Sequence, residues 1–316
     1  MRALHWDGNQ LQLHKTYPEP QEKEGWALVQ IRLAGICSTD LQILKGYMGF
    51  TGVPGHEFVG EVVAGATALC GKRVVGEINF ACGACEWCHR QLGRHCANRQ
   101  VMGILNADGS FAQYLKVPLA NLHEVSENVP DEAAVFTEPI AAAFEILEQV
   151  HLYPGAEVVV LGDGKLGLLC AQILHVAGVS VTVVGKHEKK LALLRQLGVR
   201  AIVRTAWTAQ PTDIVVEATG TADGLSHAMS IVRPRGTLVL KSTVAQAHSV
   251  SLAPLVINEV TVVGSRCGPF PPALQVLAQG KLSVTPLIDQ IYPLVEGLAA
   301  MHHAAQPGVL KVLLRP

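Results

Sequence analysis

Four cysteines lie close together in one short segment of the chain, at Cys82, Cys85, Cys88 and Cys96. A tetrahedral zinc ion accepts four thiolates, and cysteines with this spacing can wrap a single ion. Gly83 permits a tight turn between the first two. Because an all-thiolate shell leaves no position for a substrate, the segment predicts a structural zinc site. Iron in the same shell is the less favoured alternative.

A second set of potential metal ligands is spread along the chain. Cys37 offers a thiolate, His56 an imidazole, and Glu57 and Glu138 offer carboxylates. Each residue alone is a weak signal, but together they supply the three protein ligands that a catalytic zinc needs beside one open position. Asp40 is expected to hold the ring of His56 from behind.

A glycine-rich turn follows the apolar run 158–161 and precedes an apolar helical segment. It reads GxGxxG between strand and helix, which is the context of a dinucleotide-binding turn. The glycines let the backbone approach a pyrophosphate, and the helix N-terminus faces its charge. The residues expected to contact the cofactor are Gly162, Gly164, Lys165, Leu166 and Gly167.

The end of the next strand bears on which cofactor binds. An NAD site usually carries Asp or Glu there to bind the ribose 2′-hydroxyl, whereas this strand ends in Gly185. The basic residues that follow are Lys186, His187 and Lys190. Space and positive charge favour a 2′-phosphate, so we expect NADP. NAD remains possible, because Glu188 can also serve the ribose.

The pattern of apolar residues places these motifs in two domains. Up to about residue 122 the chain reads as short strands and Gly/Pro-rich loops, which predicts a small β-rich domain with strands at 26–33, 57–63 and 73–76. From residue 157 strands and helices alternate, which predicts a doubly wound α/β domain. Its expected buried strands are 158–161, 181–184, 214–216, 238–240 and 260–263, and its expected crossover helices include 189–197 and 224–232.

Two further segments connect the domains. Residues 131–150 are helical in pattern, with Asp131 as the expected N-cap and with Pro139 expected to kink or interrupt the helix. The apolar strand 309–314 is expected to return to the first domain.

Composition excludes several classes of protein. The chain has 316 residues, 25 Lys+Arg against 26 Asp+Glu and a net charge of −1, so it lacks the electrostatic signature of nucleic-acid or anionic-membrane binding. Without a signal-peptide pattern or an uninterrupted apolar span, a cytoplasmic protein is expected. Clustered cysteines then indicate metal rather than disulfides. Cys70, Cys170 and Cys267 are expected to be buried packing residues.

The order of these motifs, from Cys37-Ser-Thr-Asp and Gly55-His-Glu through the four cysteines to Glu138-Pro and the glycine turn, resembles the medium-chain zinc-containing alcohol and polyol dehydrogenases. The resemblance covers almost the whole chain. It implies a GroES-like catalytic domain formed by residues 1–139 and 267–316 and a Rossmann domain formed by 140–266, with the active site in the cleft between them. It also implies a homodimer or homotetramer that pairs through the last Rossmann strands.

The resemblance also implies roles for single residues. Cys37 and His56 match zinc ligands, Glu138 matches the third ligand position, and Glu57 matches a carboxylate that binds the ion in some members. Which of the two acids binds at rest is left open. Thr39 matches the hydroxyl that contacts the substrate oxygen and passes on its proton. Two more positions are notable: Lys311, which matches a basic residue near the cofactor pyrophosphate, and Gln42, which replaces the histidine of many members at the outer end of the proton path.

The expected reaction is hydride transfer between NADP(H) and a secondary alcohol, a polyol or a sugar hydroxyl, or the matching carbonyl, with zinc as Lewis acid. Two alternatives remain. A zinc-independent quinone or enoyl reductase of the same fold generally lacks the ligand set found here. A zinc-ribbon module that binds nucleic acid or a protein explains the four cysteines, but it explains neither the glycine turn nor Cys37 and His56. The balanced charge also argues against it.

Overall fold

The described residues, 1–65, 67–243 and 249–316 of a computed structural model, form two compact units. Unit 1 comprises Met1–Glu138, Ala273–Gly280 and Leu287–Pro316, and unit 2 comprises Pro139–Pro272 and Lys281–Pro286. The division expected from the sequence differs from this one mainly near the C-terminus. There, the chain passes between the units more than once before it ends in unit 1.

The centre of unit 1 is an open sheet with the strand order β10-β5-β4-β3-β18-β17, in which β9 also pairs with β3. Its strands are β3 (Trp26–Gly35), β4 (Glu57–Ala64), β5 (Arg73–Gly76), β9 (Tyr114–Pro118), β10 (Leu122–Glu124), β17 (Ile288–Pro293) and β18 (Lys311–Arg315). The three strands expected at 26–33, 57–63 and 73–76 are therefore confirmed. The last strand, β18, runs antiparallel to β3 with Leu313 opposite Gly35, so the predicted return of the C-terminal strand is also confirmed.

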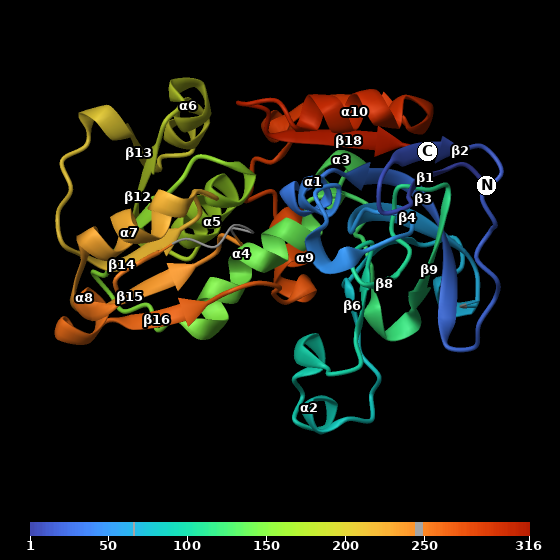
Figure 1. Cartoon of the computed structure of the whole chain (residues 1–316), viewed down its shortest axis with the longest axis horizontal. Coiled ribbons are helices and arrows are strands. Elements are labelled where there is room, and N and C mark those ends of the chain that lie inside the picture. Colours follow the sequence, from blue (N-terminus) through green and yellow to red (C-terminus); the bar gives the residue numbers. More distant parts are fainter. Residues whose placement is uncertain (66, 244–248) are drawn as a thin grey trace. The chain divides into compact units, whose positions relative to one another are not determined.

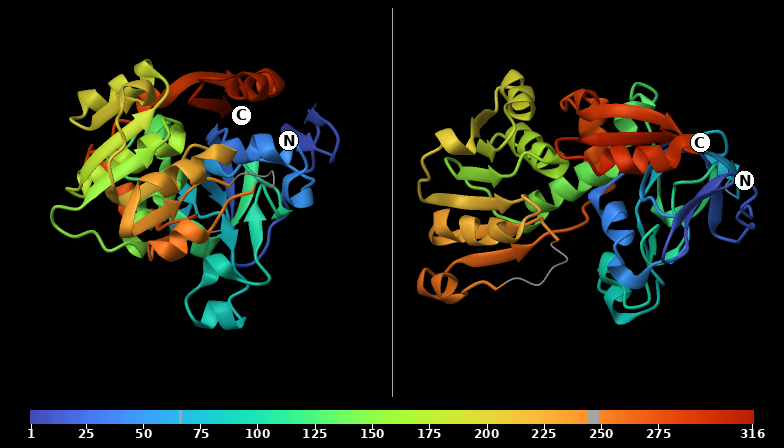
Figure 2. Two further views of the ribbon diagram at one scale, coloured as in Figure 1. Left: turned by 60° about the vertical axis from the view of Figure 1, so that its left-hand side comes forward. Right: turned by 45° about the horizontal axis from the view of Figure 1, so that its top comes forward.

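Smaller elements complete unit 1. A hairpin of β1 (Ala3–Trp6) and β2 (Leu11–His14) forms one of them, and a small sheet of β6 (Asn79–Phe80), β7 (Gln100–Met102) and β8 (Asn106–Ala107) forms another. The segment between β6 and β7 carries α2 (Glu86–His89) and projects from the strands of unit 1 (Figures 1 and 2). Two further helices are α1 (Ser38–Ile43) and α10 (Gly297–Ala304).

Unit 2 is the predicted doubly wound domain. Its parallel sheet has the order β13-β12-β11-β14-β15-β16 over the part of the chain that the structure describes (Figure 1). The strands are β11 (Glu157–Leu161), β12 (Ser180–Gly185), β13 (Arg200–Val203), β14 (Thr212–Glu217), β15 (Val232–Leu240) and β16 (Thr261–Gly264). The connecting helices are α5 (Lys165–Val176), α6 (Glu188–Gln196), α7 (Ala222–Ile231) and α8 (Ala253–Ile257). Because β12 and β14 flank β11 on opposite sides, the strand order reverses at β11, and ligands bind at the carboxyl ends of strands beside such a switch point.

The helix predicted over 131–150 is divided differently from the expectation. It forms α3 (Asp131–Ala134) and α4 (Thr137–Gln149), and the break precedes Pro139. Pro139 is the third residue of α4, where a backbone N–H has no partner within the helix, so the ring is accommodated. Asp131 is not the N-cap, which is Pro130; its carboxylate instead accepts a hydrogen bond from Arg73 at 2.8 Å.

One expectation about the cysteines is wrong. Cys170 is buried as predicted and Cys267 is half-buried, but Cys70 is exposed. Cys70 lies in the turn just before β5, where the chain runs over the surface. Among the helices of the described residues, none has the length and apolar character needed to cross a membrane.

Candidate active site and metal centres

Cys37, His56 and Glu57 converge in unit 1. One ligand atom from each lies within 4.8 Å of the others, so the three side chains can hold a single metal ion. The sheet explains this convergence. Cys37 follows the end of β3, Glu57 begins β4, and the antiparallel register places Gly35 opposite Glu57. Ligands separated by nineteen positions in the sequence are therefore neighbours in the fold.

Asp40 fixes both segments that carry these ligands. Its side chain is fully buried, and its carboxylate accepts hydrogen bonds from the backbone N–H of Cys37 at 2.7 Å and from that of Gly55 at 3.2 Å. The same carboxylate lies 3.2 Å from His56 Nδ1, so the expected support of the imidazole by Asp40 is present. Gly55 has φ +98°, and a Cβ there would collide with Phe111, so no other residue fits beside His56.

Glu57 is paired with a lysine from the far end of the sequence. The Lys311 ammonium binds Glu57 Oε2, and both side chains are 1% exposed. Burial lowers the pKa of Lys311, but the charges of Glu57 and Cys37 outweigh it and leave that pKa raised. The family resemblance implies a position near the cofactor pyrophosphate for Lys311. Instead, the pairing of β18 with β3 carries the side chain into the interior of unit 1, where it also lies 3.4 Å from the carbonyl of Ile36.

The donor set fits a zinc ion. Within the described residues, Glu57 Oε1 and His56 Nδ1 are buried and lack a well-aligned hydrogen-bond partner. An unpaired buried carboxylate oxygen is costly, and a cation would satisfy it. Burial lowers the pKa of His56, but Asp40 and Cys37 together raise it well above 6.5. The surroundings of the His56 imidazole thus favour a positive charge there, which a metal ion can supply in place of the proton. Thiolate, imidazole and carboxylate with one open position are the ligand set of a catalytic zinc.

Of the other predicted catalytic residues, Thr39 lies beside this group and Glu138 is outside it. Glu138 is half-buried in the first turn of α4 and is not a member of the three-ligand group. Thr39 lies in the first turn of α1, with its hydroxyl 3.9 Å from Cys37 Sγ. Gln42 is half-buried one turn further along the same helix. The acid beside Cys37 and His56 is therefore Glu57.

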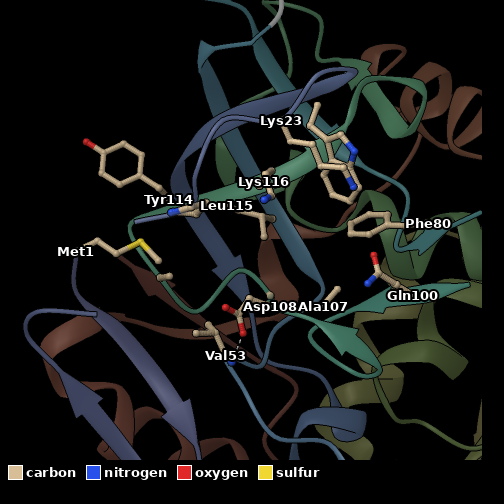
Figure 3. A pocket seen from close by; sticks show the side chains of 14 residues that line it. Met1, Lys23, Val53, Phe80, Gln100, Ala107, Asp108, Tyr114, Leu115 and Lys116 are labelled. Atoms are coloured by element: carbon tan, nitrogen blue, oxygen red, sulfur yellow. Dashed lines mark hydrogen bonds between the residues drawn. The ribbon is translucent and has the colours of Figure 1, made fainter. Parts of the chain in front are cut away.

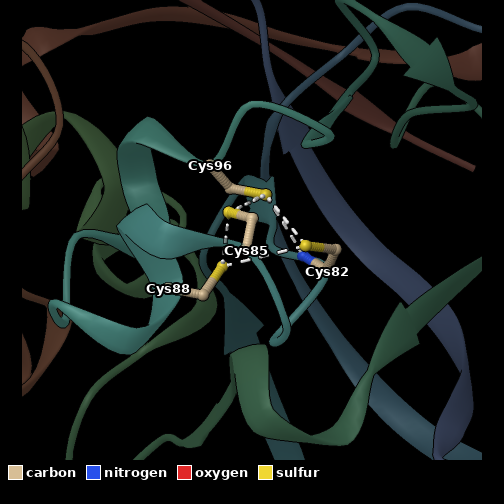
Figure 4. Close-up of side chains that lie close together, drawn as sticks. All are labelled: Cys82, Cys85, Cys88 and Cys96. Carbon is tan, nitrogen blue, oxygen red and sulfur yellow. Dashed lines mark hydrogen bonds between the residues drawn. The ribbon is translucent and has the colours of Figure 1, made fainter.

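Cys82, Cys85, Cys88 and Cys96 face one another in the projecting segment, as the sequence predicted (Figure 4). Their sulfurs are separated by 3.5 Å between Cys85 and Cys88, 3.7 Å between Cys85 and Cys96, and 3.5 Å between Cys96 and Cys82. Backbone N–H groups of Cys88 and Ala97 lower the pKa of Cys85 to about 6. A favoured thiolate in a group of four converging sulfurs suits a tetrahedral zinc.

In unit 2 the glycine turn has the backbone that a pyrophosphate requires. Gly162 adopts φ +114°, and a Cβ there would lie 2.5 Å from the carbonyl of Ala218. A Cβ on Gly167 would lie 2.2 Å from the carbonyl of Gly162. Gly164 is the N-cap of α5 and opens onto free space, and Lys165 and Leu166 form the first turn of that helix. The turn therefore leaves the helix N-terminus accessible to an anion.

The basic residues predicted after Gly185 follow the tip of β12. Lys186 and His187 are exposed and Lys190 is half-buried. Glu188, the acid that offered an alternative contact to the ribose, is paired with Arg195 on α6. A residue that the sequence did not reveal also lies here. Asp163, inside the glycine turn, accepts hydrogen bonds from the backbone N–H groups of Lys186 and His187.

A separate pocket of about 220 Å³ lies in unit 1 (Figure 3). Trp26 and Phe80 contribute aromatic surface to it, and Lys23 and Lys116 contribute positive charge. The Lys23 ammonium is 4.2 Å from the centre of a Trp26 ring. The pocket lining includes none of the metal ligands proposed above.

Comparison with known proteins gives matches over most of the chain. Residues 23–127 match the family model of the alcohol dehydrogenase GroES-like domain, and residues 166–279 match that of the zinc-binding dehydrogenases. An L-threonine 3-dehydrogenase from Streptomyces avermitilis is 30% identical and covers 94% of each chain. The chain belongs to the medium-chain zinc-containing alcohol and polyol dehydrogenases. This dehydrogenase is therefore an oxidoreductase, and the zinc-ribbon alternative is excluded.

The chain is also similar to a polyol dehydrogenase and to a solved structure that holds a coenzyme. A sorbitol dehydrogenase from Halalkalibacterium halodurans is 27% identical, with 95% of this chain and 94% of the relative covered. The solved structure of a zinc-binding dehydrogenase from Sinorhizobium meliloti 1021, bound to NADP, superimposes with a TM-score of 0.91 at 25% identity and covers 100% and 99% of the two chains. The GroES-like and Rossmann folds expected from the sequence are thereby confirmed.

Proposed function

We propose that this dehydrogenase uses zinc to transfer hydride between NADP(H) and a secondary alcohol, a polyol or a sugar hydroxyl, or the matching carbonyl. The convergence of Cys37, His56 and Glu57 within 4.8 Å carries the proposal, because it supplies three ligands of the types that a catalytic zinc takes. The buried and unpartnered Glu57 Oε1 supports it, since a bound cation would satisfy that oxygen.

The residues around the metal have distinct tasks. A zinc ion bound there supplies Lewis acidity that lowers the pKa of an alcohol hydroxyl. Asp40 fixes the backbone of Cys37 and the ring of His56, which keeps the ligands in place before substrate arrives. Thr39, beside Cys37, would accept a hydrogen bond from the alcohol hydroxyl and relay its proton, giving up its own hydroxyl proton to water. Lys311 holds Glu57 by its other oxygen and balances the negative charge of the thiolate and carboxylate.

The coenzyme binds to unit 2 in this proposal. Its pyrophosphate lies at the turn Gly162–Gly167 and the N-terminus of α5, where the glycines leave room and the helix end favours an anion. Lys186, His187 and Lys190 attract a 2′-phosphate. The NADP bound by the Sinorhizobium meliloti structure supports the same choice.

Self-association is part of the proposal. β16 forms an edge of the parallel sheet, and apolar side chains are exposed on it and on the preceding α8. Val262 is 42% exposed, Val256 76% and Ile257 78%. An exposed apolar edge strand is a surface for pairing with another strand. A second copy of the chain, paired through β16, would cover it as a homodimer, and two such dimers would form a homotetramer.

A substrate screen combined with metal analysis tests the proposed function. The purified protein is offered secondary alcohols, polyols and sugars with NADP or NAD, and the reduced nicotinamide is followed by its absorbance. The proposal predicts two zinc ions per chain and turnover of at least one alcohol class, which is lost when zinc is chelated. The similarity to a sorbitol dehydrogenase makes linear polyols the first compounds to test. Turnover of quinones or enoyl substrates at one zinc per chain would instead support the zinc-independent reductase.

A further inference from the structure

The tip of β12 lacks an acidic side chain in the sequence, yet the fold places one there. Gly185 ends β12, and the carboxyl group of Asp163 lies directly against it. A Cβ built on Gly185 would be 2.5 Å from Asp163 Cβ and 2.6 Å from Asp163 Oδ2. The carboxylate thus occupies the space that a side chain at position 185 would fill. The sequence indicated NADP because position 185 is glycine, whereas the structure shows that the space beside this glycine is already taken by an acid.

Several contacts hold Asp163 in that position. Oδ2 accepts hydrogen bonds from the backbone N–H of Lys186 at 2.7 Å and of His187 at 2.6 Å. His187 Nδ1 lies 3.1 Å from both carboxylate oxygens. The backbone N–H of Gly162 donates to the carbonyl of Val184 at 2.9 Å, which ties the glycine turn to β12 just before its tip. The carboxylate is therefore fixed on a rigid frame made of two adjacent strands.

Asp163 retains both charge and capacity for a ligand. Burial raises its pKa, but the hydrogen bonds from His187 and Lys186 outweigh burial and lower it, so the group is a carboxylate at neutral pH. Its side chain remains 9% exposed. A carboxylate offers about four acceptor sites, and the three donors from Lys186 and His187 leave one for a hydroxyl group.

We propose that Asp163 replaces the missing acid of β12 and is a specificity-determining residue that lowers the preference for NADP over NAD. This inference rests on the proposed binding of a nicotinamide dinucleotide at the glycine turn. The carboxylate accepts a hydrogen bond from the ribose 2′-hydroxyl of NAD and repels the 2′-phosphate of NADP. It also occupies the N–H groups of Lys186 and His187, which a phosphate would otherwise bind. Asp163 therefore opposes the attraction that the side chains of Lys186, His187 and Lys190 exert on a 2′-phosphate.

The test measures binding rather than turnover. ADP-ribose and its 2′-phosphate are titrated calorimetrically into the full-length protein and into Asp163→Asn. Asparagine can still accept both backbone hydrogen bonds, so the loop keeps its support while the charge is removed. The proposal predicts that the affinity for the phosphorylated probe, relative to the unphosphorylated one, rises by about tenfold, since one charge pair near the surface is worth roughly this factor. The rise should shrink at 1 M salt.

Three further variants sharpen the result. In Asp163→Gly/Gly185→Asp the acid moves from the glycine turn to the tip of β12, and the Cβ of position 163 that would collide with a side chain at 185 is removed. The relative affinity for the phosphorylated probe should return to the wild-type value after its rise in Asp163→Gly. Asp213→Asn is the matched control. Asp213 lies in the same sheet but near the start of β14, at the amino ends of the strands, where it is bonded to the N–H of Glu157 at the start of β11 and to Arg233. Its change should therefore leave the ratio of affinities unaltered.

The possible outcomes separate this inference from the function it rests on. An equal loss of affinity for both probes in Asp163→Asn would mean that the residue only supports the loop, and it would overturn the inference. A fall in relative affinity for the phosphorylated probe would also overturn it. If the wild-type protein binds neither probe, the dinucleotide site itself is wrong and the proposed function fails together with the inference.

Discussion

The ammonium of Lys311 binds the carboxylate of Glu57 in the interior of unit 1, where each side chain is only 1% exposed. The two residues are 254 positions apart in the sequence, and only the pairing of β18 with β3 brings them together. Beside them lies the thiolate position of Cys37, whose charge also raises the pKa of Lys311. The C-terminal strand thus supplies the positive charge that balances the proposed zinc ligands.

Lys311→Met should destabilise the zinc-free protein strongly. It leaves Glu57 buried without a counter-charge, and breaking a buried ion pair from one side costs about 3–5 kcal/mol. The free energy of unfolding from urea titration measures the loss. Zinc should offset part of this loss by binding the Glu57 carboxylate, and Lys311→Met/Glu57→Gln should recover part of the lost stability without metal.

The control is Lys72→Met, which removes an ion pair with Glu124 whose side chains are 53% and 50% exposed. This substitution should cost less than about 1 kcal/mol. Equal losses in the two single variants would contradict this account.

The cysteine segment should hold its metal independently of the catalytic group. Cys85→Ser removes a ligand that lies 3.5 Å from Cys88 Sγ, so the zinc content should fall from two ions per chain to one. Hydrogen exchange should accelerate in residues 82–99 while the strands of unit 1 stay protected. The control is Cys70→Ser, which changes an exposed cysteine outside the cluster and should retain both ions. A Cys85→Ser protein that still binds two zinc ions would show that the four thiols do not form one site.

The decrease in the free energy of unfolding at alkaline pH should depend in part on Tyr17. Burial and the nearby Asp108 carboxylate raise the pKa of Tyr17 from 10.0 to about 12. Between these two values the unfolded chain releases the phenolic proton while the folded protein retains it, so the free energy of unfolding falls as pH rises from 10 toward 12. The contribution is fully present below pH 10. Tyr17→Phe should therefore lose less stability than the wild type as pH rises from 10 toward 12, measured by urea unfolding. Parallel losses in the two proteins would mean that Tyr17 titrates normally.

The exposed edge of unit 2 should control assembly. Val262→Lys places a charge on β16, which should shift the protein toward monomer in sedimentation velocity experiments. Val295→Lys introduces the same charge at a similarly exposed residue of unit 1, with Val295 48% exposed against 42% for Val262, and should not change the sedimentation coefficient. Equal effects of the two substitutions, or none from Val262→Lys, would place the interface elsewhere.

Periodicity and turn chemistry predicted most of the fold. The apolar runs that the sequence assigned to strands all lie in the parallel sheet, and those in its interior are buried because a strand covered on both faces must be apolar along its length. The expected burial of 260–263 is wrong, because β16 lies at the edge of the sheet and its residues are exposed or half-buried. The same reasoning was less reliable at Pro139, because proline near the start of a helix breaks no hydrogen bond and need not interrupt it.

The site was predictable where ligand type and spacing suffice, and unpredictable where partners are distant in sequence. Cys37, His56 and the four clustered cysteines could be selected because few other functions require those residues in that order. The pairing of Lys311 with Glu57 depends on strand order, which no local pattern encodes. Asp163 was overlooked because the coenzyme rule considers only the strand tip. An acid inside the glycine turn together with Gly185 was the available signal.

Zinc content and turnover of Cys37→Ser, measured on the same preparation, test most directly whether Cys37, His56 and Glu57 hold a catalytic zinc ion. The account predicts one zinc ion per chain, located in the cysteine segment, and no detectable alcohol oxidation, while the thermal stability of unit 2 is unchanged. Thr39→Val in parallel should keep both ions and lose turnover. Two zinc ions and wild-type turnover in Cys37→Ser would contradict the account.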